Sequence, residues 1–489
     1  MSRRLLAVVA AFALASCAVG PDFKAPAAPA DAGYTPEKLA DTAATDVAGG
    51  GAQHFNSGED IPGEWWSLFH SSALDTLVKE ALAHNPDLTA AQASLRQAHE
   101  NTLATEGNFF PTIGAEYTHT REKFNGAAFG NPNEHGFFSL NTGEVTVGYA
   151  PDVFGGTRRQ LEASEAAETY QRFQLEAAYL TLTSNVVAAA VQEASLRAQI
   201  AATQDIVKAE SDQLDLLNHQ FELGAVARSA VLQQTATLAQ EKATLPPLEK
   251  KLAQQRDRIA ALAGRFPSHP PDETFDLATL TLPQALPVSL PSRLVEQRPD
   301  VRAAEATLHQ ASADIGVATA NMLPQFNLTG DIGTEAVTIG SMFAAGTGIW
   351  SMAAGVTQPL FHGGTLLHEK RAAEAAYDGA AAQYRSTVLS AFQNVADTLR
   401  ALQSDADALQ ADTAAERSAN ESLSLARDQY RLGAVSLIEL LNAETTYEQA
   451  RIALVQAQAA RYADTAALFE ALGGGWWHRS DVAQNQTQD

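Results

Sequence analysis

The sequence has little cysteine, little aromatic content and few basic residues. It contains one cysteine among 489 residues, so it can form neither an intramolecular disulfide nor a cysteine-rich zinc site. Aspartate and glutamate outnumber lysine and arginine by 57 to 33, whereas a nucleic-acid-binding surface needs the opposite balance. Only 7% of the residues are aromatic, although 45% are hydrophobic. This composition is typical of long packed helices rather than of a globular enzyme.

Motifs for catalysis and for cofactor binding are also missing from the sequence. It has no His-Glu-x-x-His zinc motif, no phosphate-binding P-loop and no Gly-x-Ser-x-Gly nucleophile motif. The twelve histidines are scattered, and even His362 and His368 are six residues apart, which does not place them on one helical face. We therefore expect no enzyme activity, no metal site and no cofactor other than a covalent lipid.

The first residues have the pattern of a bacterial lipoprotein signal. Arg3 and Arg4 precede eleven apolar residues that end at Ala15, a length that suits an export signal and is too short to span a bilayer. The following Ser16-Cys17 completes a stretch that resembles the lipobox, in which the cysteine is lipidated and becomes the first mature residue. We predict a lipid anchor on Cys17, and the alternative is an ordinary export signal with an incidental cysteine.

The mature sequence is a tandem duplication. Residues 85–98 match residues 298–311 at an offset of 213, with eight of fourteen positions identical, and residues 220–226 match residues 429–435 at an offset of 209. Two copies of about 200 residues exclude a short-period solenoid. The expected segments are a signal peptide at 1–16, a tether at 17–70, a first repeat at 71–264, a proline-rich connector at 265–291, a second repeat at 292–473 and a flexible tail at 474–489.

Each copy contains a helix followed by a β-hairpin. Asn85 and Pro86 are typical of a helix cap and a first helical residue. Apolar and polar residues then alternate, which predicts one hairpin at about 111–153, with a loop over 123–139, and a second hairpin at about 324–358. No segment of the mature chain has 18 consecutive apolar residues, so only strands could cross a membrane, and each is long enough for the roughly 9–11 residues of a tilted crossing.

A very long helix is predicted after each hairpin. Residues 157–223 contain neither proline nor glycine, and residues 365–432 contain only Gly379. Helices of this length would extend about 100 Å. In the second copy, apolar residues recur alternately every four and three positions, which predicts a coiled-coil seam. The seam residues are Val388, Phe392, Val395, Leu399, Leu402, Ala406 and Leu409.

Glycines are expected to end both long helices. Gly224 and Gly433 occupy equivalent positions, and a second helix follows each of them and returns antiparallel, to about 263 in the first copy and 472 in the second. Pro246-Pro247 is expected to kink or split the first returning helix.

The predicted strand count requires oligomerisation if the strands span a membrane. Two hairpins supply four strands, whereas the smallest single-chain barrels need about eight. Open sheet edges are not tolerated in lipid, so a ring of identical chains is the natural solution.

Motifs in order along the chain resemble the TolC/OprM/NodT family of outer-membrane efflux factors. They are the lipoprotein start at Cys17–Phe23, the entry motif at Trp65–Phe69, the second-copy signature at Leu290–Leu294 and Arg298–Val301, and the barrel-exit motif at Gln358–Phe361 with Gly363 and Gly364. Together these motifs cover nearly the whole mature chain.

The resemblance implies a fold, a location and partners. The fold is an α+β membrane protein, a homotrimer whose twelve strands form one β-barrel that is continued by an α-helical periplasmic barrel. It would lie in the outer membrane of a Gram-negative bacterium, in contact with outer-membrane lipid, and dock to a periplasmic adaptor (membrane fusion) protein and an inner-membrane pump of the RND type. The implied function is an exit duct for small molecules such as drugs. Two alternatives stay open: a type I secretion duct, and a lipid-anchored coiled-coil scaffold without a pore.

The resemblance also assigns site residues. Glu439 and Asn442 map onto the acidic positions of the channel aperture, and because the family often has aspartate at the second, Glu439 is left as the expected acidic ring. From the residues alone, Glu439 is a solvated carboxylate on a helix face. The helix turns map onto the adaptor-docking tip, for which the candidates are Leu223, Gly224, Arg228, Leu432 and Gly433.

Overall fold

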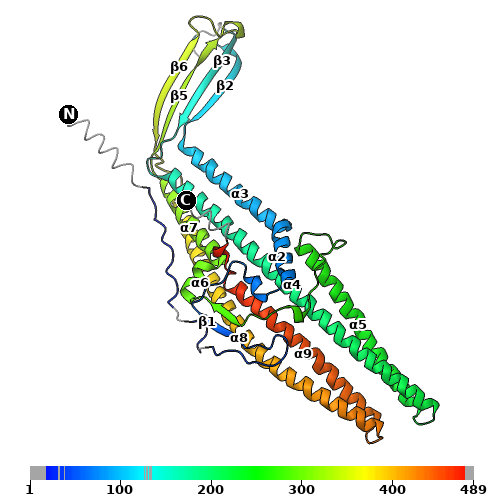
Figure 1. The fold of residues 1–489 in the computed structure, drawn as a ribbon. Helices are drawn as coiled ribbons and strands as arrows, with labels where there is room; N and C mark the ends of the chain where they lie inside the picture. Colours follow the sequence, from blue (N-terminus) through cyan, green and yellow to red (C-terminus); the bar gives the residue numbers. More distant parts are fainter. Residues whose placement is uncertain are drawn as a thin grey trace. The chain divides into compact units, whose positions relative to one another are not determined.

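The computed structural model describes residues 18–30, 33–37, 39–125, 127, 130 and 135–479. The predicted signal peptide, Cys17 and the tail from residue 480 lie outside the described residues. The chain divides into two units (Figure 1). Unit 1 consists of Met1–Pro26, Leu95–Gln171 and Ala304–Tyr384, and unit 2 of Ala27–Ser94, Arg172–Ala303 and Arg385–Asp489.

The order of helices and strands repeats the duplication of the sequence. The helices are α2 (Ser72–His84), α3 (Pro86–Glu106), α4 (Gly156–Glu222), α5 (Arg228–Leu262), α6 (Pro291–Gln297), α7 (Pro299–Ala320), α8 (Thr365–Arg431) and α9 (Leu437–Ala471). The strands are β1 (His54–Ser57), β2 (Thr112–Asn125), β3 (His135–Tyr149), β4 (Ala285–Val288), β5 (Gln325–Ala336) and β6 (Gly348–Thr357). Short 3-10 turns are η1 (Trp65–Phe69), η2 (Gly107–Phe109), η4 (Leu277–Thr279), η5 (Ile339–Ser341) and η6 (Trp476–His478).

Unit 1 contains a four-stranded antiparallel sheet in the order β2-β3-β5-β6 (Figure 1). Each predicted hairpin forms one half of it, and the halves meet where β3 pairs with β5, with Val145 opposite Ile332. The first hairpin is longer than expected, because β2 continues to Asn125 and β3 starts at His135, inside the stretch predicted to be loop. Two outer edges remain without a strand partner among the described residues, one on β2 and one on β6.

The core of unit 2 includes the aromatic residues of the entry motif. Trp65 and Phe69 are fully buried, and the Trp65 ring lies 5.4 Å from the ring of Phe469 on α9. Nearby, β1 and β4 pair in parallel and join the tether to the connector, a pairing that the sequence analysis does not predict. Burying such large aromatic surfaces contributes a few kcal/mol per side chain at about 25 cal/mol per Å².

One buried arginine binds the tether to α9. Arg461 is fully buried and donates hydrogen bonds to the carbonyl of Leu402 (2.7 Å), the carbonyl of Gly51 (3.2 Å) and the Thr42 hydroxyl (3.2 Å). Burial lowers the pKa of Arg461, and the nearby carboxylates of Asp405 and Asp464 oppose this shift. Backbone oxygens therefore satisfy most of this guanidinium, and the tether is ordered where it meets α9.

The long helices agree closely with the sequence pattern. Within α8, six of the seven predicted seam residues are buried, whereas Phe392 is half-buried and Ala391 takes its place. The helix α5 runs unbroken through Pro246 and Pro247, so the expected split does not occur. Among the described residues, no helix has the length and apolar character needed to cross a membrane.

The tail begins later than predicted. Gly474 and Gly475 are buried, and the Trp476 indole donates a hydrogen bond to the backbone carbonyl of Gln297 (2.6 Å). Arg479 then donates to Glu176 (2.8 Å). These residues were expected to be flexible because the tail is polar, but their N–H donors find acceptors on unit 2.

Candidate functional site

The sheet of unit 1 places most of its apolar side chains on one face and most of its polar side chains on the other. Because residues paired across strands point to the same face, the register puts one set on a common surface. That apolar face carries Ile113, Ala115, Tyr117, Val145, Val147, Tyr149, Phe326, Leu328, Ile332, Trp350, Met352, Ala354 and Val356. Three of these, Ile113, Trp350 and Met352, are 74%, 75% and 81% exposed in a single chain. A contiguous exposed apolar surface of this kind marks a contact with lipid or another chain.

The opposite face of the sheet is polar and acidic. Its residues include Thr118, Thr146, Asn327 and Thr329, as well as three carboxylates. Glu116 lies directly opposite Glu144, and Thr146 lies opposite Asp331. Like charges on directly opposed positions are unfavourable unless they face water. The polar face is therefore suited to an aqueous surface.

The two helix turns in unit 2 have the same geometry. Gly224 and Gly433 adopt φ values of 74° and 73°, as predicted, in the left-handed region that favours glycine. In each turn the next residue, Ala225 or Ala434, donates a 2.8 Å hydrogen bond to a carbonyl five residues earlier. This is the Schellman arrangement that ends helices. Both turns lie at the same end of unit 2 (Figure 1).

The predicted tip residues are exposed at these turns. Leu223 and Leu432 are 72% and 82% exposed, which is high for leucine side chains. Arg228 is the first residue of α5 and is also exposed, whereas the neighbouring Arg431 forms an ion pair with Asp428. The tip thus presents the side chains of Leu223, Leu432 and Arg228 to solvent.

The predicted aperture residues lie at the start of α9. Glu439 is exposed and forms a capping box, in which its carboxylate accepts a 3.0 Å hydrogen bond from the backbone N–H of Ser436. In return, the Ser436 hydroxyl accepts one from the backbone N–H of Glu439 (3.3 Å). Asn442 is exposed one turn later. Glu439 therefore has a structural role in beginning α9, besides any role of its charge.

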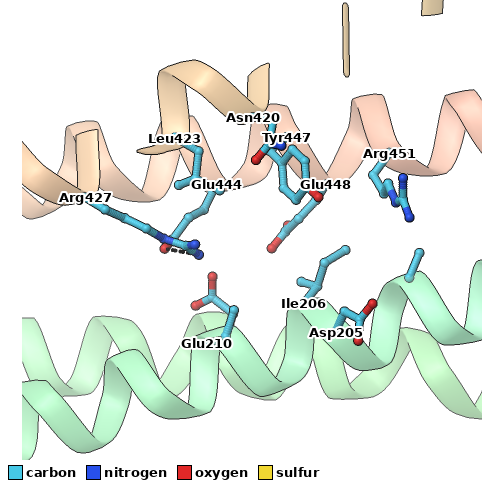
Figure 2. Close-up of a pocket in the computed structure, with 12 residues that line it drawn as sticks. Asp205, Ile206, Glu210, Asn420, Leu423, Arg427, Glu444, Tyr447, Glu448 and Arg451 are labelled. Carbon is cyan, nitrogen blue, oxygen red and sulfur yellow. Dashed lines mark hydrogen bonds and ion pairs between the residues drawn. The ribbon is translucent and has the colours of Figure 1, made fainter. Parts of the chain in front are cut away.

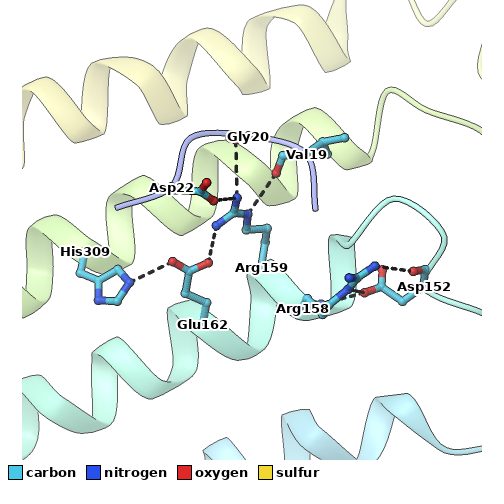
Figure 3. A network of polar contacts seen from close by, with 8 residues as sticks. All are labelled: Val19, Gly20, Asp22, Asp152, Arg158, Arg159, Glu162 and His309. Carbon is cyan, nitrogen blue, oxygen red and sulfur yellow. Dashed lines mark hydrogen bonds and ion pairs between the residues drawn. The ribbon is translucent and has the colours of Figure 1, made fainter. Parts of the chain in front are cut away.

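A polar clamp in unit 1 holds the segment that follows Cys17 (Figure 3). Arg159 on α4 is almost fully buried and donates hydrogen bonds to the backbone carbonyl of Val19 (3.1 Å) and to Asp22 (2.7 Å). It also bonds Glu162 (2.6 Å). Burial alone would lower the pKa of Arg159, but hydrogen bonds and charge attraction from Asp22 and Glu162 raise it above its usual value.

Aromatic stacking and close backbone packing complete the clamp. Phe23 stacks on His309 of α7 with ring centroids 4.3 Å apart, and His309 lies 2.9 Å from Glu162. Gly20 has a φ of 96°, and a Cβ at this position would lie 2.4 Å from the Cα of Gly316. Only glycine fits there, so the segment is held by shape as well as by charge.

Neither this clamp nor a cluster of acids on the helices of unit 2 is predicted from the sequence. No local pattern identifies the contacts of Arg159 with Val19 and Asp22, because these residues are about 140 positions away in the sequence. The acid cluster had a signal on α9: Leu440, Glu444 and Glu448 recur every four residues, so two glutamates follow a buried leucine along one helical face. Within the described ranges, no group of three or more potential ligands could hold a metal ion.

Comparison with known proteins identifies the family of this chain. The family model described as "Outer membrane efflux protein" matches residues 77–265 and 290–474, which include both repeats and most of the chain. The chain belongs to the outer membrane efflux protein family.

Relatives within the outer membrane efflux protein family match over nearly their full length. The antibiotic efflux pump outer membrane protein ArpC of Pseudomonas putida is 27% identical, over 99% of this chain and 98% of ArpC. The probable outer membrane lipoprotein SilC of Salmonella typhimurium is 26% identical, over 97% of this chain and 99% of SilC. The solved structure of the outer-membrane channel OprN superposes with a TM-score of 0.83 at 27% identity, over 94% of this chain and 100% of OprN.

Family membership confirms the location and function expected from the resemblance. The chain is an outer-membrane efflux channel, the exit duct of an efflux system. This result decides against a scaffold without a pore, and members of the family are transport ducts rather than enzymes.

The glycine turns yield a test with an internal control. Gly433→Ala and Gly224→Ala should each weaken the last turn of the preceding helix and raise its amide hydrogen-exchange rate about fivefold, because a left-handed backbone costs an alanine about 1 kcal/mol. A Cβ at either position would meet no atom within 4 Å, so this strain is the whole effect.

Gly379→Ala is the matched control for these variants. Gly379 lies inside α8, where a Cβ also meets no atom within 4 Å, so the same substitution should slow exchange around it. A change of the same sign at Gly379 and Gly433 would contradict the assignment of the turn.

Proposed function

We propose that three copies of this efflux channel join edge to edge, so that twelve strands close into one barrel. The observation that carries the proposal is the sheet of unit 1, which has an exposed apolar face and two unpaired edges, on β2 and β6. In lipid, each unpaired backbone group costs several kcal/mol, and pairing β6 of one copy with β2 of the next removes every edge. The similarity to OprN, which is named as an outer-membrane channel, supports a closed pore.

In this assembly the apolar face of the sheet contacts lipid and the acidic face lines an aqueous lumen. On β2 the apolar face ends after Tyr117, where His119, Arg121 and Lys123 follow at the same parity. A band of limited height followed by basic residues suits a bilayer and its polar boundary. Glu116, Glu144 and Asp331 would give the lumen a preference for cations.

The partners are a periplasmic adaptor protein and an inner-membrane pump of the RND type, and the cargo is small molecules such as drugs. The name of ArpC, an antibiotic efflux pump outer membrane protein, supports efflux over type I protein secretion. The adaptor would engage the tip, where Leu223 and Leu432 are exposed beside Gly224, Arg228 and Gly433. If the alanine variants of the glycines disorder the turns but adaptor binding is unchanged, the tip is not the docking surface.

Lipidation of Cys17 would anchor each copy. The clamp around Arg159 supports this proposal, because it orders the chain from Val19 onward against α4 and α7. SilC, a relative over its full length, is named as a probable outer membrane lipoprotein.

The anchor is tested by labelling. Cys17→Ala should abolish incorporation of labelled palmitate, since the chain has no other cysteine. Equal labelling of the variant would refute the anchor, whereas loss of localisation is not the criterion because the strands can hold the protein in the membrane.

The barrel is tested by two adjacent alanines on β6. Ala354 pairs with Leu328 on the apolar face, and Ala353 pairs with Thr329 on the polar face. On the lipid face of a barrel an acidic side chain is destabilising, although by less than the roughly 2–4 kcal/mol that arginine or lysine costs at the midplane. Ala354→Asp should therefore reduce the yield of membrane-inserted channels that conduct in planar bilayers. Ala353→Asp should insert normally, and a loss of insertion that is equal in both variants would refute the orientation of the sheet.

The aperture is tested at Glu439. Glutamine keeps the capping box but removes the charge, so Glu439→Gln should preserve α9 while lowering the cation-to-anion permeability ratio about twofold. Glu421→Gln on α8 is the control, because Glu421 is exposed and forms no capping interaction. Equal changes in reversal potential for both variants would show that Glu439 is one carboxylate among many.

A further inference from the structure

Four helices of unit 2 converge on a buried group of glutamates (Figure 2). Glu210 is on α4, Glu241 is on α5, and Glu444 and Glu448 are on α9. Glu210, Glu444 and Glu448 line a cavity of about 220 Å³, together with Arg427 of α8. Glu210 and Glu444 are only 1% and 3% exposed, which is rare for glutamate.

Within this group, the carboxyl groups of Glu210 and Glu444 face each other, and one oxygen of Glu444 has no hydrogen-bond donor among the described residues. Figure 2 shows the Glu210 carboxyl pointing across the cavity toward Glu444 and Arg427. One oxygen of Glu444 lies 3.4 Å from Arg427, but Oε2 has no hydrogen-bond donor among the described residues. Glu210 accepts a hydrogen bond from the neutral Gln234 amide, and among the described residues no cation forms an ion pair with Glu210 itself. A proton held between them would satisfy the unpartnered oxygen.

Positive charge around the pair is scarce. Arg427 is the one cation among the described residues that forms an ion pair with Glu444, while Arg451 lies 3.7 Å from Glu416. The other charged groups facing the cavity are Asp205 on α4 and Glu448 on α9, and Glu241 of α5 acts on Glu448. Full ionisation would therefore place several negative charges around one guanidinium, in a site largely removed from water.

The titration of the cluster is consistent with this geometry. Burial, and then the charge and hydrogen bonding of Glu210, raise the pKa of Glu444 to about 8, although Arg427 opposes the shift. Burial and the charges of Glu241 and Glu210 raise the pKa of Glu448 to about 7.

We propose that Glu210 and Glu444 share a proton and form a latch that holds the start of α9 against α4, and that loss of this proton loosens the first turns of α9. Glu444 lies seven residues after Leu437, the first residue of α9, so the latch acts two turns from the helix start that bears Glu439. The proposal concerns helix packing within one chain, and it does not depend on the cargo or on the subunit number.

The sign of the pH dependence follows from the raised pKa. The pKa of Glu444 is higher in the folded protein than its ordinary value of 4.5, so the folded protein binds this proton more tightly than the unfolded chain does. The stabilising contribution of this proton is complete below 4.5 and is lost as the pH rises through about 8. The latch is therefore closed in mild acid and open in mild alkali.

Hydrogen exchange on the full-length protein tests the latch. Between pH 5.5 and 8.5, protection factors of amides in residues 437–451, corrected for intrinsic exchange, should fall about tenfold or more in the wild type. In Glu444→Gln, whose amide mimics the protonated acid and can donate to Glu210, the same protection factors should fall less than about threefold. Glu421→Gln, at an exposed position of α8, should keep the wild-type dependence.

Glu210→Gln gives a second and independent reading, which also serves if Glu444→Gln fails to fold. It removes the other half of the pair and leaves Glu444 with Arg427, so the pH dependence should again be reduced. The latch would be overturned if protection in Glu444→Gln or Glu210→Gln fell with pH as much as in the wild type. It would also be overturned if protection in the wild type did not fall.

Discussion

The unpaired edges of the four-stranded sheet constrain how this chain can enter a membrane. In water the outer N–H and C=O groups of β2 and β6 would be solvated, but in hydrocarbon each needs a protein partner. The apolar face of the same sheet is too exposed to be explained by a single chain in water, since Trp350 and Met352 are three-quarters exposed or more. In the proposed assembly, lipid contact and edge pairing require each other: lipid contact makes open edges intolerable, and pairing the edges of identical copies would remove them in a closed ring.

The long helices of unit 2 are held together by packing against one another. The seam on α8 is built from valine, leucine and alanine, and the aromatic core near Trp65 and Phe469 anchors the other end of α9. Where α9 begins, apolar packing gives way to the cluster of glutamates. The packing of the start of α9 thus depends on the protonation of this cluster. The same end of the helix directly follows the turn at Gly433.

Local and periodic features could be predicted from the sequence, and contacts between distant residues could not. Period-two alternation predicted β2, β3 and β5, whereas β6 alternates less cleanly and was predicted as the return strand of the second hairpin. The Gly224 and Gly433 turns followed from their position at the end of long helical segments. Asn85 caps α3 as expected, since its side chain accepts hydrogen bonds from Asp87 (2.9 Å) and Leu88 (3.2 Å).

The features that the sequence did not predict have three different physical origins. The clamp at Arg159 and the tether contacts of Arg461 join segments that are more than a hundred residues apart, and no periodicity encodes such pairings. The seam prediction selected Phe392 by spacing, whereas the bulky ring is half-buried and the smaller Ala391 occupies the buried position. Proline lacks one donor and disfavours the helical conformation of its predecessor, yet α5 continues through Pro246 and Pro247 because the remaining hydrogen bonds of a 35-residue helix sustain it.

Measurement of the mass of the detergent-solubilised protein, with its β-sheet signal recorded on the same sample, tests the central claim most directly. Closure by edge pairing predicts a particle with the mass of three chains, about three times 51.9 kDa, that retains its β signal. A stable monomer with an intact β signal would contradict the account, because four paired strands would then persist with both edges open.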